Sequence, residues 1–159
     1  MATSTIPGAV DYLVSTVRDL AAFAEPVIVC DGWPDQGAET AIVIGITPED
    51  DSTGVQNFHA ELGAQAQWEE YDIPCTIWAQ RGGAQEAMKI ARDAAFTLFD
   101  ALDSHLRTAA GRTLGGALRS GAAILSAVAV QQTGDAPEAG DGRQCQLLFT
   151  IRCKSRSAA

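Results

Sequence analysis

The sequence predicts an α+β fold, in which a mostly antiparallel sheet carries two helices on one face. One observation is a long helical stripe of apolar residues at about 85–109, and another is a set of short β-rich runs on both sides of it. With an apolar helical pattern near the start, they give the order helix, two strands, two strands, long helix, two strands. Helices laid on one face of antiparallel hairpins bury the apolar sides of both. The 159 residues, 47% of them hydrophobic, are expected to form a single domain, 1–159, with 155–159 frayed.

The first helix is expected to begin at Pro7 and to stop before Pro26. Proline suits a first helical turn, because the N–H that it lacks would have no partner there. Two runs of β-branched residues follow, at 27–30 and 41–46, and we interpret them as buried strands. Because few residues connect them, we expect these strands to be antiparallel neighbours.

Alternation of apolar and polar residues predicts the next pair of strands, at 58–68 and 71–79, with two glutamates at 69–70 between them. Trp68 shares the apolar face of the first of these strands, which favours a position in the core. Pro74 lacks a backbone donor, so the second strand is expected to lie at an edge or to carry a bulge.

The helix at 85–109 has the clearest pattern in the chain. Its alanines allow close packing against a sheet, and the glycines at 111 and 115–116 are expected to end it. The stripe that it is expected to bury consists of Ala87, Met88, Ile90, Ala91, Ala94, Ala95, Leu98, Phe99, Leu102 and Leu106.

Two strands are predicted after the long helix. The run at 117–131 is apolar on both faces and is interpreted as a central strand that is either long or bent near Gly121. A polar loop at 133–142 leads to a cleanly alternating strand at 143–154. The apolar face of this last strand consists of Cys145, Leu147, Phe149, Ile151 and Cys153.

Charge and composition exclude several classes of protein. The chain has 11 basic and 20 acidic residues, a net charge of −9, and its bases are scattered, so it lacks the basic stripe of a static nucleic-acid binder. The acidity indicates a solvated surface, or one that repels a polyanion or meets a basic partner. The apolar run at 115–130 contains an arginine and two serines and is too short to span a membrane. Residues 1–7 show no secretory signal, which favours the cytoplasm, or release from it by lysis.

No motif indicates catalysis or a cofactor. The four cysteines form no CxxC pair and lie in apolar runs, which is typical of buried free thiols. A nucleophilic Cys75 served by His59 across neighbouring strands is the alternative. The glycines at 82–83 lack a phosphate-binding pattern. The carboxylates Glu69, Glu70 and Asp72 have no histidine beside them, so we expect them to lie on a solvated face. We therefore expect no enzyme, and no metal, nucleotide or organic cofactor.

Four stretches of the chain carry a family resemblance. They are EEYDIPCTIWAQRGG at 69–83, AQEAMKIARDAAFTLFDAL at 84–102, TLGGAL at 113–118, and the final alternating strand with its basic end. In pattern and order, from about residue 10 to 154, the chain resembles the tail terminators of long-tailed phages, the tail-completion proteins of the lambda minor tail protein U type.

The resemblance implies a virion protein assembled in the host cytoplasm. Tail terminators form a ring, expected here to be hexameric, which caps the head-proximal end of the tail tube, stops tube growth and joins the tail to the head–neck connector. The partners are then copies of this chain, the tube protein, the connector or stopper, and DNA in transit through the lumen; no membrane is involved. The alternatives are a neck or head-completion (stopper) protein, a tail-tube subunit and, outside the virion, a small cytoplasmic enzyme or ligand-binding domain.

Loops and edges are the expected functional surfaces. Trp33, in the turn-rich segment DGWPDQG, either caps the core or docks a neighbour. At least one of two acidic loops is expected to face the lumen or an adjoining ring, because a ring multiplies the charge of each cluster. The loop at 133–142 is the better candidate of the two. The candidate interface or lumen residues are Trp33, Glu49, Asp50, Asp51, Asp135, Glu138 and Asp141.

Overall fold

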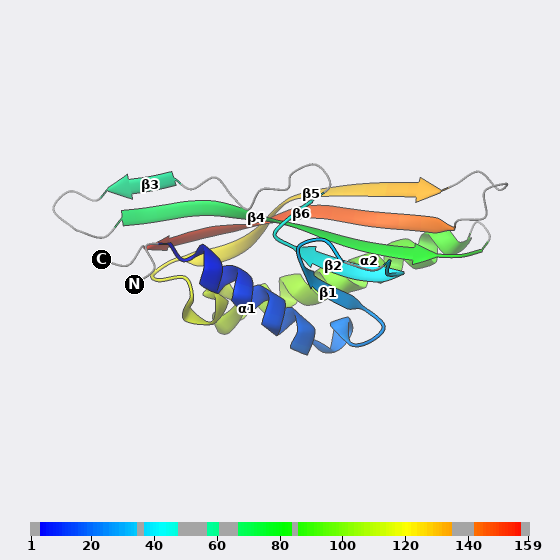
Figure 1. Cartoon of the computed structure of the whole chain (residues 1–159), viewed down its shortest axis with the longest axis horizontal. Helices are drawn as coiled ribbons and strands as arrows, with labels where there is room; N and C mark the ends of the chain where they lie inside the picture. Colours follow the sequence, from blue (N-terminus) through cyan, green and yellow to red (C-terminus); the bar gives the residue numbers. More distant parts are fainter. Residues whose placement is uncertain are drawn as a thin grey trace.

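The computed structural model describes residues 4–34, 37–47, 57–60, 67–83, 86–134 and 142–156. It confirms the α+β fold: within these residues a six-stranded, mostly antiparallel sheet carries its helices on one face (Figure 1). The strands follow the order β1-β2-β4-β6-β5, and β3 pairs with the beginning of β4. The helices are α1 (Ile6–Asp19), α2 (Glu86–Leu106) and α3 (Ala109–Arg112), with 3₁₀ turns η1 (Ala21–Phe23) and η2 (Leu114–Gly116). The strands are β1 (Ile28–Asp31), β2 (Thr40–Ile44), β3 (Asn57–Ala60), β4 (Gln67–Arg81), β5 (Ala122–Gly134) and β6 (Arg143–Arg156).

The centre of the sheet is the long antiparallel pair of β4 and β6. The two strands keep one register from Trp68↔Arg156 to Arg81↔Arg143. Ser155 and Arg156, which we expected to be frayed, belong to β6, and Ser155 is buried; residues 157–159 lie outside the described ones. The alternation predicted for β6 is confirmed, because its buried, helix-facing residues include Cys145, Leu147, Phe149, Ile151 and Cys153.

Helix α2 lies over β4 and β6, as its apolar stripe predicted. Ala91 and Ala95 are fully buried, so the helix backbone approaches the strands closely. Phe99 packs edge to face on Phe149 of β6, with ring centroids 5.2 Å apart. Ile90, which we expected in the stripe, lies on the outer side and is 54% exposed. The buried residues of the helix are Ala87, Ala91, Ala95, Leu98, Leu102 and Leu106.

Strands β1 and β2 are neighbours, as expected. They are parallel, however, whereas we expected them to be antiparallel. A four-residue strand is only about 13 Å long, so the connecting segment 32–39 can return along it to start β2 in the same direction. The expectation that both are buried is correct for β2 and wrong for β1, whose residues are exposed or half-buried because it is the last strand on its side.

The strand expected at 58–68 is divided in the structure. Residues 57–60 form β3, residues 61–66 lie outside the described ones, and β4 begins at Gln67 and continues through the two glutamates. The edge or bulge expected at Pro74 is wrong, because β4 lies between β2 and β6. The proline is tolerated because the β2 ladder ends at Ile44↔Cys75. Next to this end, Pro74 takes part as an acceptor, since Gly45 N donates to Pro74 O at 2.8 Å.

Strand β5 is an edge strand and not the central strand that its apolar composition suggested. It begins at Ala122, because residues 117–121 form the turn that follows η2. The bend expected near Gly121 lies in this turn, where the neighbouring Ser120 has a φ of 53°. A β-bulge between Ser126 and Ala129 bends the strand itself.

Candidate functional site: the open edges of the sheet

The outer margin of β5, here called the β5 edge, belongs to a long uncharged strand that pairs, among the described residues, with β6 alone. Its 13 residues, AAILSAVAVQQTG, include neither a charge nor a proline. Ile124, Val128 and Val130 are 56%, 46% and 46% exposed. Soluble monomers usually protect such an edge with lysine, proline or a short strand, because its unpaired backbone groups can pair with another chain. The composition of β5 is therefore typical of a strand that is covered in an assembly.

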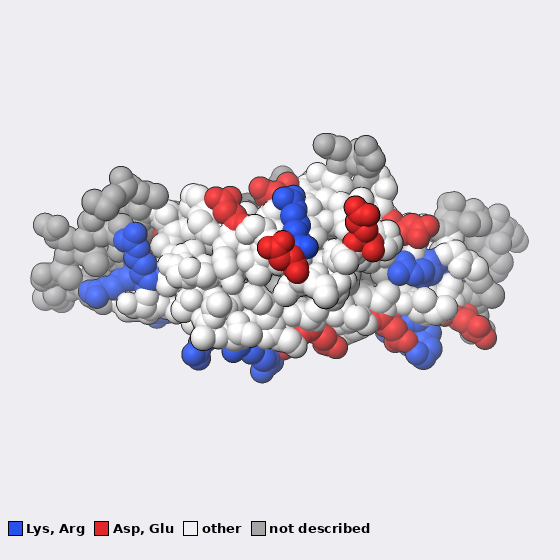
Figure 2. All heavy atoms as spheres, turned by 90° about the horizontal axis from the view of Figure 1, so that it is seen from below, with Lys and Arg blue, Asp and Glu red and all other residues white. Residues whose placement is uncertain are grey.

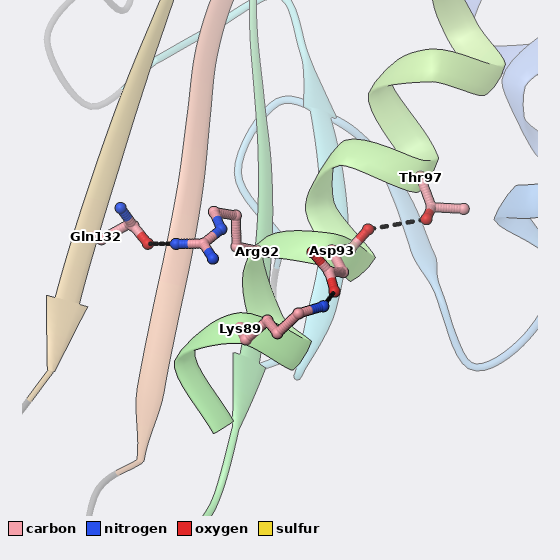
Figure 3. A network of polar contacts seen from close by, with 5 residues as sticks. All are labelled: Lys89, Arg92, Asp93, Thr97 and Gln132. Carbon is pink, nitrogen blue, oxygen red and sulfur yellow. Dashed lines mark hydrogen bonds and ion pairs between the residues drawn. The ribbon is translucent and has the colours of Figure 1, made fainter. Parts of the chain in front are cut away.

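Polar contacts fix β5 to α2 without covering its edge. Arg92 of α2 donates from Nη1 to Gln132 Oε1 of β5 at 3.2 Å (Figure 3). On the same helix Lys89 pairs with Asp93, whose backbone carbonyl accepts a hydrogen bond from Thr97 Oγ1 at 2.8 Å. These exposed contacts add little stability, but the Arg92 contact orients the second half of β5 on the helix layer.

The opposite margin of the sheet carries an open groove beside β1, here called the β1 groove. It consists of two adjoining hollows of about 610 and 370 Å³ that share Arg18, Ile28 and Val29. Arg18 of α1 donates from Nη2 to Val29 O at 3.3 Å across it. Trp33 and Asp31 line the second hollow, and Glu25 lines the first. The lining of the groove thus combines apolar side chains with charged groups.

Trp33 is the one candidate site residue that the structure describes. Its side chain is 50% exposed and lines the β1 groove, so it does not cap the core. A large exposed indole beside a strand edge is typical of a contact residue. The other candidates, Glu49, Asp50, Asp51, Asp135, Glu138 and Asp141, lie outside the described residues.

The face of the sheet opposite the helices carries two cross-strand ion pairs. Asp72 accepts two hydrogen bonds from Arg152, at 2.9 and 3.2 Å, and Lys154 lies 2.8 Å from Glu70. The pairing with Asp72 raises the pKa of the Arg152 guanidinium further above its ordinary value. The Lys154 ammonium also lies 5.2 Å from the ring centroid of Trp68, which is half-buried on this face and not in the core below the helices. Because these groups pair with each other across the strands, they favour the observed register of β4 and β6.

Glu69 is fully buried, contrary to the solvated position that its sequence context suggested. Its Oε1 accepts hydrogen bonds from Thr5 N, at 2.6 Å, and from Thr5 Oγ1, directly before α1 begins. A carboxylate at a helix N-terminus satisfies free N–H groups and interacts favourably with the helix dipole. Tyr71 lies 2.9 Å from the same hydroxyl, and burial raises its pKa above the ordinary value. This cluster anchors α1 on the sheet.

The buried thiols are poor nucleophiles. Burial raises the pKa of Cys75 to about 12 and that of Cys153 to about 12, so both remain protonated at neutral pH. His59 is opposite Trp68 in the β3–β4 register, well removed from Cys75 along β4. The other histidine, His105, lies 3.0 Å from the Tyr12 hydroxyl and links α2 to α1. The pairing of Cys75 with His59 that the sequence left open is therefore absent.

The described ranges hold no candidate metal centre and no candidate membrane helix. No group of three or more histidine, cysteine, aspartate or glutamate side chains is arranged there to hold a metal ion. None of the helices described is long and apolar enough to cross a membrane. The features that stand out on this part of the chain are therefore the β5 edge and the β1 groove.

The fold and these two surfaces define an α+β sheet protein with two open margins of different character. No family model matches the chain, and no curated protein is similar to it in sequence. Among solved structures, a chain of the "Virion of native gene transfer agent (GTA) particle" aligns with 97% of this chain and 100% of its own length, at 15% identity and a TM-score of 0.46. At this score and identity, the comparison assigns neither a family nor a role.

Proposed function

We propose that this chain is a virion structural protein of a long-tailed phage, and within that class a tail terminator. It forms a ring on the head-proximal end of the tail tube, stops tube polymerisation and joins the tail to the head–neck connector. The observation that carries the proposal is the β5 edge, 13 uncharged residues with three exposed aliphatic side chains. Such an edge needs a covering partner, and a subunit of an assembly has one.

The two open margins favour a ring over a symmetric pair. They lie at opposite ends of the strand order and differ in sequence and length, so one margin of a copy meets a different margin of the next. A contact between two different surfaces is head-to-tail, and it generates a closed ring when the rotation between subunits closes. The six-fold symmetry comes from the family resemblance of the sequence.

The charge of the chain suits a channel for DNA. A net charge of −9 per subunit is multiplied in a ring, and a negative lumen repels a polyanion, which reduces its adhesion during ejection. We assign this role to the acidic loops that contain Glu49, Asp50 and Asp51, and Asp135, Glu138 and Asp141. The second loop connects the two long strands β5 and β6 and is the stronger candidate.

Deleting the gene from the phage or prophage that encodes this chain tests the proposal. We expect overlong tail tubes without heads in negative-stain electron micrographs, because nothing stops tube growth or supplies the joining surface. A plasmid copy of the gene restores tails of normal length.

Three other outcomes contradict the terminator role. Normal-length tails detached from heads indicate a stopper, and the absence of tubes indicates a tube subunit. Unchanged particles exclude a structural role in the virion, and leave the ligand-binding domain or enzyme.

The role of the second acidic loop is tested in the same complementation assay. Replacing Asp135, Glu138 and Asp141 with serine is expected to lower the infectious titre about tenfold or more, because the lumen loses three charges per subunit. The matched control replaces Glu86, Asp93 and Asp100, three exposed acids on α2, and is expected to keep the titre of the parent. Normal tail length, head joining and titre in the loop variant contradict the assignment.

A further inference from the structure

The side of the molecule around β1 is acidic. Asp19, Glu25, Asp31 and Glu39 are exposed there, and none takes part in an ion pair among the described residues. Arg18, on the same side, uses its guanidinium to donate to a β1 carbonyl. Figure 2 shows carboxylates gathered around a single basic group in the upper half of the view.

The segment that leads into β5 is basic. Residues 107–121 contain Arg107, Arg112 and Arg119, all exposed, and no acid. Arg107 pairs with Asp103, whereas Arg112 and Arg119 form no ion pair within the part of the chain that is described. Arg112 belongs to α3, which contacts β5, and Arg119 comes shortly before the strand begins. Basic groups predominate at the left and lower left of Figure 2.

The backbone of β1 is available to a further strand. Gly32 N donates to Ile44 O of β2 at 3.1 Å. Backbone groups alternate in direction along a strand, so the N–H and C=O groups of Val29 and Asp31 point away from β2. Arg18 contacts one of these outward groups, Val29 O, at 3.3 Å, which is a weak and exposed bond that an incoming strand can replace.

We infer that the β1 groove of one copy receives the β5 edge of a second copy, with Arg112 and Arg119 of the second copy facing Glu25 and Asp31 of the first. This inference rests on the proposed function, since it names the contact between neighbouring subunits of the ring. The strand addition joins the two sheets through main-chain hydrogen bonds. The half of β5 before the bulge, with the exposed Ile124, lies next to the basic segment and is the half that docks.

Charge complementarity identifies the occupant as a second copy of this chain. The uncharged β5 edge loses little on desolvation, and the charges that steer it lie on its flank. Their sign is opposite to that of the four exposed carboxylates around β1. The exposed apolar side chains that line the groove, Ile28 and Trp33 at 38% and 50% exposure, match the aliphatic side chains of β5.

Charge reversal on each side tests the inference. R112E/R119E places acids on the β5 side, opposite the acids of the β1 side, and E25K/D31K places lysines at the two groove positions that are proposed to face the arginines. All four positions are exposed, so the fold is retained. We expect the parent to assemble into rings and each variant alone to associate about 100-fold more weakly, measured by mass photometry and analytical ultracentrifugation. An equimolar mixture restores the rings, because each altered side then meets a side of opposite charge, and native mass spectrometry shows a 1:1 composition.

A control variant and a groove variant complete the experiment. K89E changes the net charge by half as much as R112E/R119E, at an exposed position of α2 away from both surfaces, and assembles like the parent. Trp33→Ala removes the exposed indole from the groove and weakens assembly about tenfold, with an unchanged thermal midpoint.

The outcomes separate this inference from the proposed function. If both reversed variants assemble like the parent, the β1–β5 contact is wrong while the ring stands. If the variants fail alone and the mixture also fails, the pairing of these two surfaces is wrong. A parent that stays monomeric at every concentration overturns the inference, and the tail-length phenotype of the gene deletion then judges the proposed function independently.

Discussion

Leu98→Ala is expected to lower the free energy of unfolding by about 2–5 kcal/mol. Leu98 lies on the buried side of α2 and is 4% exposed, among the residues of the main core. Alanine removes the apolar contacts of the isobutyl group and leaves a cavity, which the long strands β4 and β6 cannot fill because their register is fixed over their whole length. Chemical denaturation followed by circular dichroism measures the change.

Ile90→Ala is the matched control on the same helix. It removes a side chain of the same size, but one that is 54% exposed and outside the core. We expect a change within about 0.5 kcal/mol, since exposed substitutions without special contacts have small effects. If Leu98→Ala is as mild as Ile90→Ala, the buried side of α2 is assigned wrongly.

The sequence predicted the elements whose own residues determine their environment. The stripe of α2 and the alternation of β6 each record burial on one side, and the structure confirms both. Burial of Trp68 below the helices and exposure of Glu69 were wrong for a shared reason. Both residues lie within β4, whose faces could be assigned only once the strand was known to begin at Gln67.

Strand neighbours were harder to predict than strands. The run that became β5 is apolar on both faces, which is typical of a central strand, yet it lies at a margin. The apolar composition of β5 indicates burial, and in the proposed assembly a second chain provides that burial. A single sequence does not distinguish a partner strand of the same chain from one of another chain. The direction of β1 was also not predictable from its residues. It depends on the course of the connection between β1 and β2, which makes the two strands parallel.

The candidate site was predicted in part. Trp33 was identified because a tryptophan in a turn-rich segment is unusual, and it lines the β1 groove. Arg18, Asp31 and the basic pair Arg112 and Arg119 were missed, because each is an ordinary surface charge in the sequence. The usable signal was the absence of acids from 107–121, which stands out in a chain with 20 acidic residues.

Gly121→Ala is expected to destabilise the protein by about 3 kcal/mol or more, because the new methyl group overlaps backbone. A Cβ at this position lies 1.7 Å from Lys154 O and 2.6 Å from Lys154 C. The overlap is with the end of β6, which the same turn holds through Arg119 N to Ser155 Oγ and Arg156 N to Arg119 O, both 2.8 Å. Relief therefore requires a shift of β6 or of the start of β5.

Gly82→Ala is the control, since a Cβ there meets nothing within 4 Å and the residue has no left-handed φ. We expect Gly82→Ala to change the free energy of unfolding by less than about 0.5 kcal/mol, or to stabilise the protein slightly by restricting the unfolded chain.

Gly121→Ala is also expected to impair assembly. Because β5 begins next to Gly121, the variant is expected to lose the register of the β5 edge, which the subunit contact requires. If the two variants are equally stable, the close approach of this turn to β6 is wrong. If Gly121→Ala is destabilised but assembles normally, the turn does not determine the register of the β5 edge.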